Sequence, residues 1–167
     1  MVRLAYSKID ESYEDVKRLS CGRKACSVMI LVANDVDAMA AARMLTQQLR
    51  TDNIAYTLRP VANFSQVIWN REQFLTDQIS VIFMINCGAT FNIPQLFKIE
   101  ASSTFKVFVL DNHRPINLAN ASSAEYVTVF VEDEELSEEL PDYDSDLEKS
   151  DEEYVYALCV NGMSSPH

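Results

Sequence analysis

The stretch Val28-Met29-Ile30-Leu31-Val32-Ala33-Asn34-Asp35-Val36-Asp37 decides the fold. Its first six residues form a continuous apolar run, which is typical of a strand that is buried on both faces of a parallel sheet. Asp37 stands where the N-cap of a helix is expected, and residues 38–50 are rich in strong helix formers. We therefore predict a strand over residues 27–33, followed by a helix that begins near Ala38 and is capped by Asp37.

Strands and helices alternate along the rest of the chain. Further strands are predicted over residues 54–61, where Pro60 marks the end, and over residues 80–85, 105–110 and 126–131. Helices are predicted over residues 7–19 and 63–75, with a short helical turn over 94–97 and a loop or helical turn over 115–120. This order favours an α/β fold, doubly wound, with a mostly parallel sheet of about five strands and flanking helices.

Charge divides the chain, which carries a formal net charge of -11. Residues 132–153 hold 13 acids and one base, a net of -12, whereas all other residues hold 12 acids and 13 bases, a net of +1. The near-neutral body lacks the basic surplus that nonspecific nucleic-acid binding needs, so we expect no strong binding to duplex DNA. We predict an α/β domain over residues 1–131, a disordered acidic segment over 132–153 and a short C-terminal tail over 154–167.

Two serines of the acidic segment are candidate phosphorylation sites. Ser145 precedes Asp146 and Glu148, and Ser150 precedes three acids, which is the context that acidophilic kinases select. A phosphate adds roughly -1.5 to -2 charges at pH 7, which would extend the segment and strengthen a contact to a basic partner. The alternative is that they are ordinary serines of an acidic tail.

The four cysteines predict neither a zinc site nor a disulfide framework, because they form no C-x-x-C pair and no metal-ligand spacing. No signal peptide is visible, and no apolar stretch approaches the roughly 18 residues that a membrane span requires. We therefore expect a soluble protein of a reducing intracellular compartment that does not associate with membranes.

Polar side chains follow two of the predicted strands. Asp35 and Asp37 follow the first strand, and Asp111 and His113 follow the strand over residues 105–110. Ligand sites of open parallel sheets lie beyond the carboxyl ends of the strands, so we expect these four side chains in one crevice, where they would suit a hard divalent ion. The alternative is that Asp37 caps the helix while Asp35 and Asp111 bind backbone amides in turns, which leaves only His113 unexplained.

Three ordered motifs resemble those of the DHH phosphoesterase superfamily, which includes RecJ-type single-strand exonucleases and manganese-dependent pyrophosphatases. They are Asp-Val-Asp at 35–37, Asn-Cys-Gly at 86–88 and Asp-Asn-His-Arg-Pro at 111–115. More closely, the sequence around these motifs, together with Tyr-Thr-Leu-Arg-Pro-Val at 56–61, resembles the eukaryotic cell division cycle 45 family. The resemblance covers about residues 25–148, and the acids from Glu132 onward resemble the start of that family's acidic insertion.

The resemblance also implies that a catalytic site has been lost. Active DHH enzymes carry metal ligands at three positions that here hold Leu31, Asn86 and Asn112, in place of a His, an Asp and a His. Too few ligands therefore remain to hold two Mn²⁺ ions, and without these ions no water is activated for attack on phosphorus. We expect no enzymatic activity, no bound metal and no other cofactor. The remnant would comprise Asp35, Asp37, Asn86, Asp111, Asn112 and His113. The alternative is an active metal-dependent phosphoesterase or single-strand exonuclease that uses Asp35, Asp37, Asp111 and His113.

By resemblance, the expected role is that of a non-catalytic scaffold in DNA replication initiation, nuclear, and partnered with the MCM ring and the GINS complex of the replicative helicase. Members of the family continue for several hundred residues, whereas nothing beyond about Leu147 resembles them. We therefore expect a truncated, alternatively spliced or mispredicted product of a longer protein. A short form that competes with a full-length relative for one partner is a further alternative.

Overall fold

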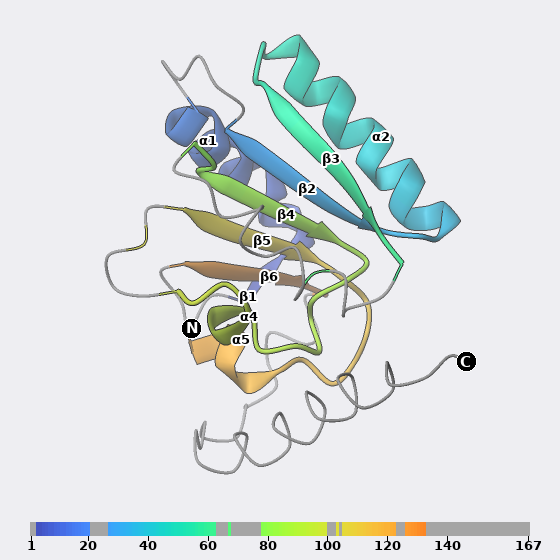
Figure 1. Cartoon of the computed structure of the whole chain (residues 1–167), viewed down its shortest axis with the longest axis vertical. Coiled ribbons are helices and arrows are strands. Elements are labelled where there is room, and N and C mark those ends of the chain that lie inside the picture. Colours follow the sequence, from blue (N-terminus) through green and yellow to red (C-terminus); the bar gives the residue numbers. More distant parts are fainter. Residues whose placement is uncertain are drawn as a thin grey trace, which may run out of the picture.

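A single six-stranded sheet forms the centre of the computed structural model, which describes residues 3–20, 27–62, 67, 78–99, 103, 105–122 and 126–132 (Figure 1). The strand order is β1-β6-β5-β4-β2-β3, and every neighbouring pair is parallel. The strands are β1 (Arg3–Ala5), β2 (Val28–Ala33), β3 (Tyr56–Val61), β4 (Val81–Ile85), β5 (Lys106–Leu110) and β6 (Val127–Val131). The predicted doubly wound α/β fold is confirmed.

Helices cover both faces of this sheet. They are the 3-10 turn η1 (Tyr6–Lys8), α1 (Ile9–Ser20), α2 (Val36–Thr51), α4 (Ile93–Leu96) and α5 (Leu118–Ser122). In β2, Val28, Ile30 and Val32 face the core cluster that contains buried residues of α1 and α2. Met29 and Leu31 face the opposite cluster, to which α4 contributes two side chains. Because β2 is buried on both sides, the period-two alternation of a half-exposed strand is missing from its sequence.

Two features of the sheet differ from the prediction. β1, a sixth strand, pairs with β6 at one end of the sheet and was not predicted, because three residues are too short to show a pattern. β3 begins at Tyr56, two residues later than predicted, and ends at Val61 as predicted, with Pro60 inside the strand and in register with Val32. β3 is the last strand in the order, and an edge strand tolerates proline because one of its sides need not donate hydrogen bonds.

Polar contacts fix α1 against its neighbours. The hydroxyl of Tyr13 donates a hydrogen bond of 2.7 Å to Asp52, the residue at the C-terminal end of α2. Burial and this hydrogen bond raise the pKa of Tyr13, so it stays a donor at neutral pH. At the start of β5, the ammonium of Lys106 lies 3.1 Å from the carboxylate of Asp15. These contacts hold α1 over the same face of the sheet as α2.

Several predictions concern residues outside the described part of the chain. They are the helix over residues 63–75 except for Val67, the disordered acidic segment beyond Glu132, the tail over 154–167, and the phosphorylation of Ser145 and Ser150. Among the described helices, none has both the length and the apolar character that crossing a membrane requires.

Candidate functional site

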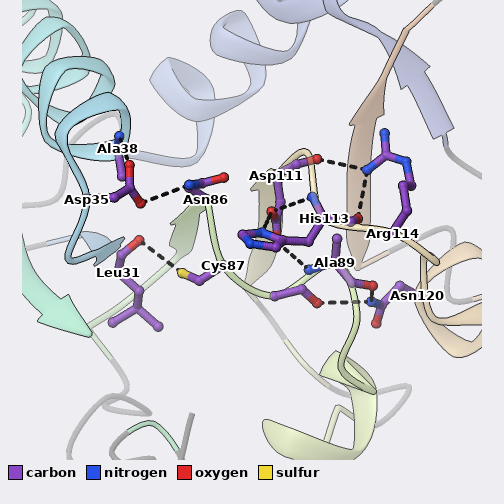
Figure 2. Close-up of polar contacts among 11 residues, drawn as sticks. Leu31, Asp35, Ala38, Asn86, Cys87, Ala89, Asp111, His113, Arg114 and Asn120 are labelled. Atoms are coloured by element: carbon purple, nitrogen blue, oxygen red, sulfur yellow. Dashed lines mark hydrogen bonds and ion pairs between the residues drawn. The ribbon is translucent and has the colours of Figure 1, made fainter. Parts of the chain in front are cut away.

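The carboxyl ends of β2 and β4 flank the point where the strand order reverses. The chain passes from β2 outward to β3 and then returns to β4 on the other side of β2. Ligand sites of open α/β sheets lie at such a switch point. Asp35 follows β2 and Asn86 follows β4, and the side-chain amide of Asn86 donates a hydrogen bond of 2.8 Å to Oδ2 of Asp35 (Figure 2). Two motifs that are 51 residues apart in the sequence therefore meet at the switch point.

Asp35, and not Asp37, is the N-cap of α2. The backbone of Asp35 is extended, and its Oδ1 accepts a hydrogen bond of 2.7 Å from the N–H of Ala38. The predicted cap at Asp37 is wrong because the turn after β2 takes only Asn34 and Asp35, so that the helix begins at Val36. Asp37 instead lies exposed in the first turn, where its charge is favourable to the helix dipole.

These contacts keep the carboxylate of Asp35 charged. The hydrogen bond from Ala38 and then that from Asn86 hold the pKa of Asp35 below its ordinary value of 3.8, and the charge of His113 acts in the same direction. Because the pKa of Asp35 is lower in the folded state than in the unfolded chain, its ionised carboxylate stabilises the fold at pH values above the unfolded pKa. This stabilisation is lost as the pH falls through the folded pKa.

Replacement of the two aspartates tests the assignment of the cap. We expect Asp35→Ala to lower the melting temperature by about 2–6 °C at pH 7, because both the cap and the contact to Asn86 disappear. Asp37→Ala should change it by less than about 2 °C, because only a dipole interaction is lost. Thermal unfolding followed by circular dichroism measures both. The gap between wild type and Asp35→Ala should shrink as the pH falls below 3.8. A larger decrease in melting temperature for Asp37→Ala than for Asp35→Ala would indicate that Asp37 is the cap.

Asp111 lies at the end of β5 and binds three donors. Its side chain is only 1% exposed. Oδ2 accepts a hydrogen bond of 2.9 Å from the N–H of Ala89, and Oδ1 accepts one of 3.0 Å from the N–H of His113. Oδ1 also lies 2.6 Å from Nδ1 of His113, whose side chain is 59% exposed (Figure 2). Asp35 and Asp111 therefore accept from backbone amides, as the alternative interpretation held, although its cap at Asp37 is wrong. The ring of His113 is held by the carboxylate of Asp111.

A buried asparagine holds the loop after β4, and the sequence did not indicate it. The side-chain amide of Asn120, from α5, donates to the carbonyls of Phe91 and Ala89 at 2.7 and 3.2 Å, and its Oδ1 accepts from the N–H of Ile93 at 2.9 Å. Gly88 in the same loop has a φ of 110°, and a Cβ there would lie 2.8 Å from Cε of Met84. The glycine after a strand was the available signal, whereas Asn120 lay in a segment that was predicted as a loop or helical turn.

Cys87 lies between the carboxylates of Asp35 and Asp111, and its thiol has low reactivity. Its thiol is partly buried and contacts the backbone carbonyl of Leu31 at 3.7 Å. Burial, and then the negative charge of Asp111, raise the pKa of Cys87 to about 12. The thiol is therefore protonated at neutral pH, so it is neither a nucleophile nor a metal-binding thiolate.

Comparisons with known proteins identify the family. The sequence model of the CDC45 family matches residues 28–157, most of the chain. The chain belongs to the CDC45 family. The cell division control protein 45 homologue of Dictyostelium discoideum is 31% identical over 144 residues, which cover 83% of this chain and 22% of that protein. The Mus musculus homologue is 32% identical over 121 residues, which cover 70% of this chain and 20% of that protein.

A solved structure supports the fold of this CDC45-family chain. The crystal structure of CDC45 from Entamoeba histolytica matches with a TM-score of 0.68 and 17% sequence identity, covering 89% of this chain and 29% of that one. The chain thus spans about a fifth of the length of the curated relatives it matches. The family match reaches residue 157, so the prediction that the resemblance ends near Leu147 is wrong.

The donor set of this CDC45-family site does not fit the two divalent ions of the DHH enzymes. All four carboxylate oxygens of Asp35 and Asp111 face N–H donors. Asn86 turns its nitrogen toward Asp35, and the side chain of Leu31 is completely buried. Asp37 and Asn112 are exposed, and no side-chain hydrogen bond joins them to the other site residues in the described part of the chain. Within that part, no group of three or more His, Cys, Asp or Glu side chains is arranged to hold a metal.

Proposed function

We propose that this chain forms the non-catalytic α/β domain of a CDC45-type replication factor. It acts as an interaction scaffold in the nucleus, in the initiation of DNA replication and in the replicative helicase. Membership of the CDC45 family supports this role. The partners are the MCM ring and the GINS complex, which follow from the family resemblance of the motifs at residues 35–37, 86–88 and 111–115.

The hydrogen bond between Asn86 and Asp35 is the observation that carries the proposal. In the DHH pattern an aspartate stands at position 86, and two carboxylates at this separation need a cation or a proton between them. Here the amide of Asn86 supplies an N–H at 2.8 Å, so that Asp35 is satisfied without an ion. The pair therefore stabilises the switch point of the sheet, and Asn86 presents its nitrogen rather than an oxygen to Asp35.

A second candidate function, a metal-dependent phosphoesterase or single-strand exonuclease, is favoured by one observation. The buried carboxylate of Asp111 orients the exposed imidazole of His113, an arrangement that suits a general base. However, Leu31, Asn86 and Asn112 stand where the DHH pattern has metal ligands, so too few ligands remain to hold the ions that activate water in that reaction. Scaffolding is therefore the better-supported function.

Partner capture tests the scaffold function. The tagged full chain is incubated with nuclear extract, and bound MCM and GINS subunits are detected by immunoblotting. We expect both to be retained above the level of the empty tag. The matched control is Asp111→Ala, used at a temperature at which circular dichroism shows it to be unfolded, and it should lose them. Retention of neither complex by the folded chain would overturn the scaffold proposal.

An activity assay separates the two functions. We expect no release of mononucleotide from single-stranded DNA, and no release of phosphate from pyrophosphate, when Mn²⁺ is added to the chain. With Leu31, Asn86 and Asn112 at ligand positions of the DHH pattern, too few ligands remain to hold the metal that would activate water. The assay compares the wild type with Asp35→Ala. Release that depends on Mn²⁺ and disappears in Asp35→Ala would contradict the non-catalytic proposal and support the phosphoesterase.

A further inference from the structure

Exposed apolar side chains of the described part gather on two neighbouring elements. Five large hydrophobic residues are exposed there, and four of them lie on α2 or β3: Val36, Met39, Met44 and Leu58. Two of these four, Met39 and Leu58, are 53% and 41% exposed. Isolated exposed apolar residues need no explanation, whereas a group of them beside an edge strand indicates a contact surface.

Met39 and Leu58 belong to one continuous surface between α2 and β3. Leu58 is in register with Ile30, and Pro60 with Val32, and both partners face the core cluster on the α2 side of the sheet. On α2, Met39, Arg43 and Arg50 recur at helical spacing along one face. That face is turned toward β3, because Nε of Arg50 donates a hydrogen bond of 2.7 Å to the hydroxyl of Tyr56. We call Met39, Arg43, Arg50, Tyr56, Leu58 and Pro60 the α2–β3 surface (Figure 1 shows the two elements at one end of the sheet).

The α2–β3 surface carries positive charge that no acid in the described part balances. The lysines and arginines of α1, and Lys106 of β5, form ion pairs with acids. Arg43 and Arg50 form no such pair within the described residues. The acid of α2, Asp37, lies on another side of the helix by its spacing, and Asp52 accepts hydrogen bonds from Tyr13 and Gln48. The surface is therefore both apolar and basic, which fits an acidic partner that also carries apolar residues.

We propose that the acidic segment of this chain, residues 132–153, docks on the α2–β3 surface. Its net charge of -12 complements the two arginines. Its acids are interrupted at regular intervals by apolar residues that match the apolar part of the surface, namely Leu136, Leu140, Tyr143 and Leu147. The near-neutral remainder of the chain offers no other described surface on which unpaired arginines and exposed apolar side chains occur together.

The acidic segment is long enough to reach this surface. The segment begins after the carboxyl end of β6, and α2 begins after the carboxyl end of β2, so both start on the same side of the parallel sheet. Four strand spacings separate β6 from β3, which is about 19 Å at roughly 4.8 Å each. About six residues of extended chain span that distance. Residues from about 138 onward, which include Leu140, Tyr143 and Leu147, are therefore far enough along the chain to span the distance to β3.

Docking in the same chain has a regulatory consequence. An acidic partner that binds the α2–β3 surface has to displace the segment first, because both use the same arginines. Phosphorylation of Ser145 or Ser150 adds roughly -1.5 to -2 charges to the segment at each site, which strengthens its attraction to the arginines. Phosphorylation is therefore expected to strengthen docking of the segment.

Photo-crosslinking in the full chain tests the proposal. p-Benzoylphenylalanine is placed at Met39, or at the exposed Gln95 of α4 on the opposite face of the sheet as the control position, and crosslinked peptides are mapped by mass spectrometry. We expect crosslinks from position 39 to residues 132–153 within one chain, at least fivefold more abundant than from position 95. Raising NaCl from 50 to 500 mM should reduce them severalfold, since the attraction is electrostatic. Absence of crosslinks to the segment would overturn the proposal, and so would crosslinks that join two chains.

A charge reversal provides the second measurement. Arg43→Glu should reduce the yield of crosslinks from position 39 at least threefold. Lys98→Glu makes the same change in net charge at an exposed lysine that lies just beyond α4, and it should leave the yield unchanged. Circular dichroism confirms that both variants are folded. Equal losses in the two variants would mean that overall charge alone attracts the segment, which would overturn docking at the α2–β3 surface.

Discussion

Replacing Asp111 with alanine is expected to destabilise the fold by about 2–4 kcal/mol, because buried hydrogen-bond donors lose their acceptor. The carboxylate is almost completely buried, and it accepts from the N–H groups of Ala89 and His113. Without it, the N–H of Ala89 stays buried and unsatisfied, and the loop after β4 loses its attachment to β5. Chemical denaturation with urea at pH 7, followed by circular dichroism, measures the change.

Two control variants separate the backbone contacts from the ion pair. His113→Ala removes the imidazole but keeps both N–H groups on Asp111. Because the ring is 59% exposed, we expect a loss below about 1 kcal/mol. Asp111→Asn keeps one oxygen but turns an N–H₂ group toward another donor, so its effect should lie between the other two. If His113→Ala costs as much as Asp111→Ala, the ion pair rather than the backbone contacts would hold the loop.

The sequence predicted the sheet best where strands are buried on both faces. β2 and β4 are continuous apolar runs, and β6 is interrupted only by the buried Thr128; the predicted start of each lies within one residue of the observed start. Nothing comparable marks β1, whose three residues become a strand only because β6 offers a free side. The cap of α2 could not be settled either. Asp35 and Asp37 both suit an N-cap, and the end of β2 at Ala33 decides between them.

The candidate site depended on strand order, which the sequence pattern does not contain. The motifs at residues 35–37 and 86–88 are each visible in the sequence, but their contact requires β4 to lie next to β2 rather than next to β3. Asn120 was missed for a similar reason, since its function depends on where α5 packs against the loop after β4. Local chemistry could therefore be predicted from the sequence, and the pairing of distant residues could not.

Asn86→Asp should be the most informative change in the site, because it alters one atom of a contact that defines it. Asn86 has a φ of 52°, and aspartate tolerates this left-handed conformation about as well as asparagine. The nitrogen that now lies 2.8 Å from Oδ2 of Asp35 becomes an oxygen. At pH 7, with EDTA present, we expect the melting temperature to fall by roughly 5–10 °C, because two like charges replace a charge-assisted hydrogen bond.

The pH and metal dependence of Asn86→Asp identify the cause of that loss. Repulsion raises one pKa of the new pair, so the deficit should shrink as the pH falls toward about 4–5 and the two carboxylates share a proton. Millimolar Mn²⁺ should restore part of the melting temperature, since carboxylate oxygens now face each other where an N–H stood. Asn86→Gly keeps the backbone conformation and removes the side chain, and its smaller loss should not change as the pH falls from 7 to about 4 and should not respond to Mn²⁺. If the aspartate and glycine variants behave alike in both respects, the contact between Asn86 and Asp35 does not stand in for a metal.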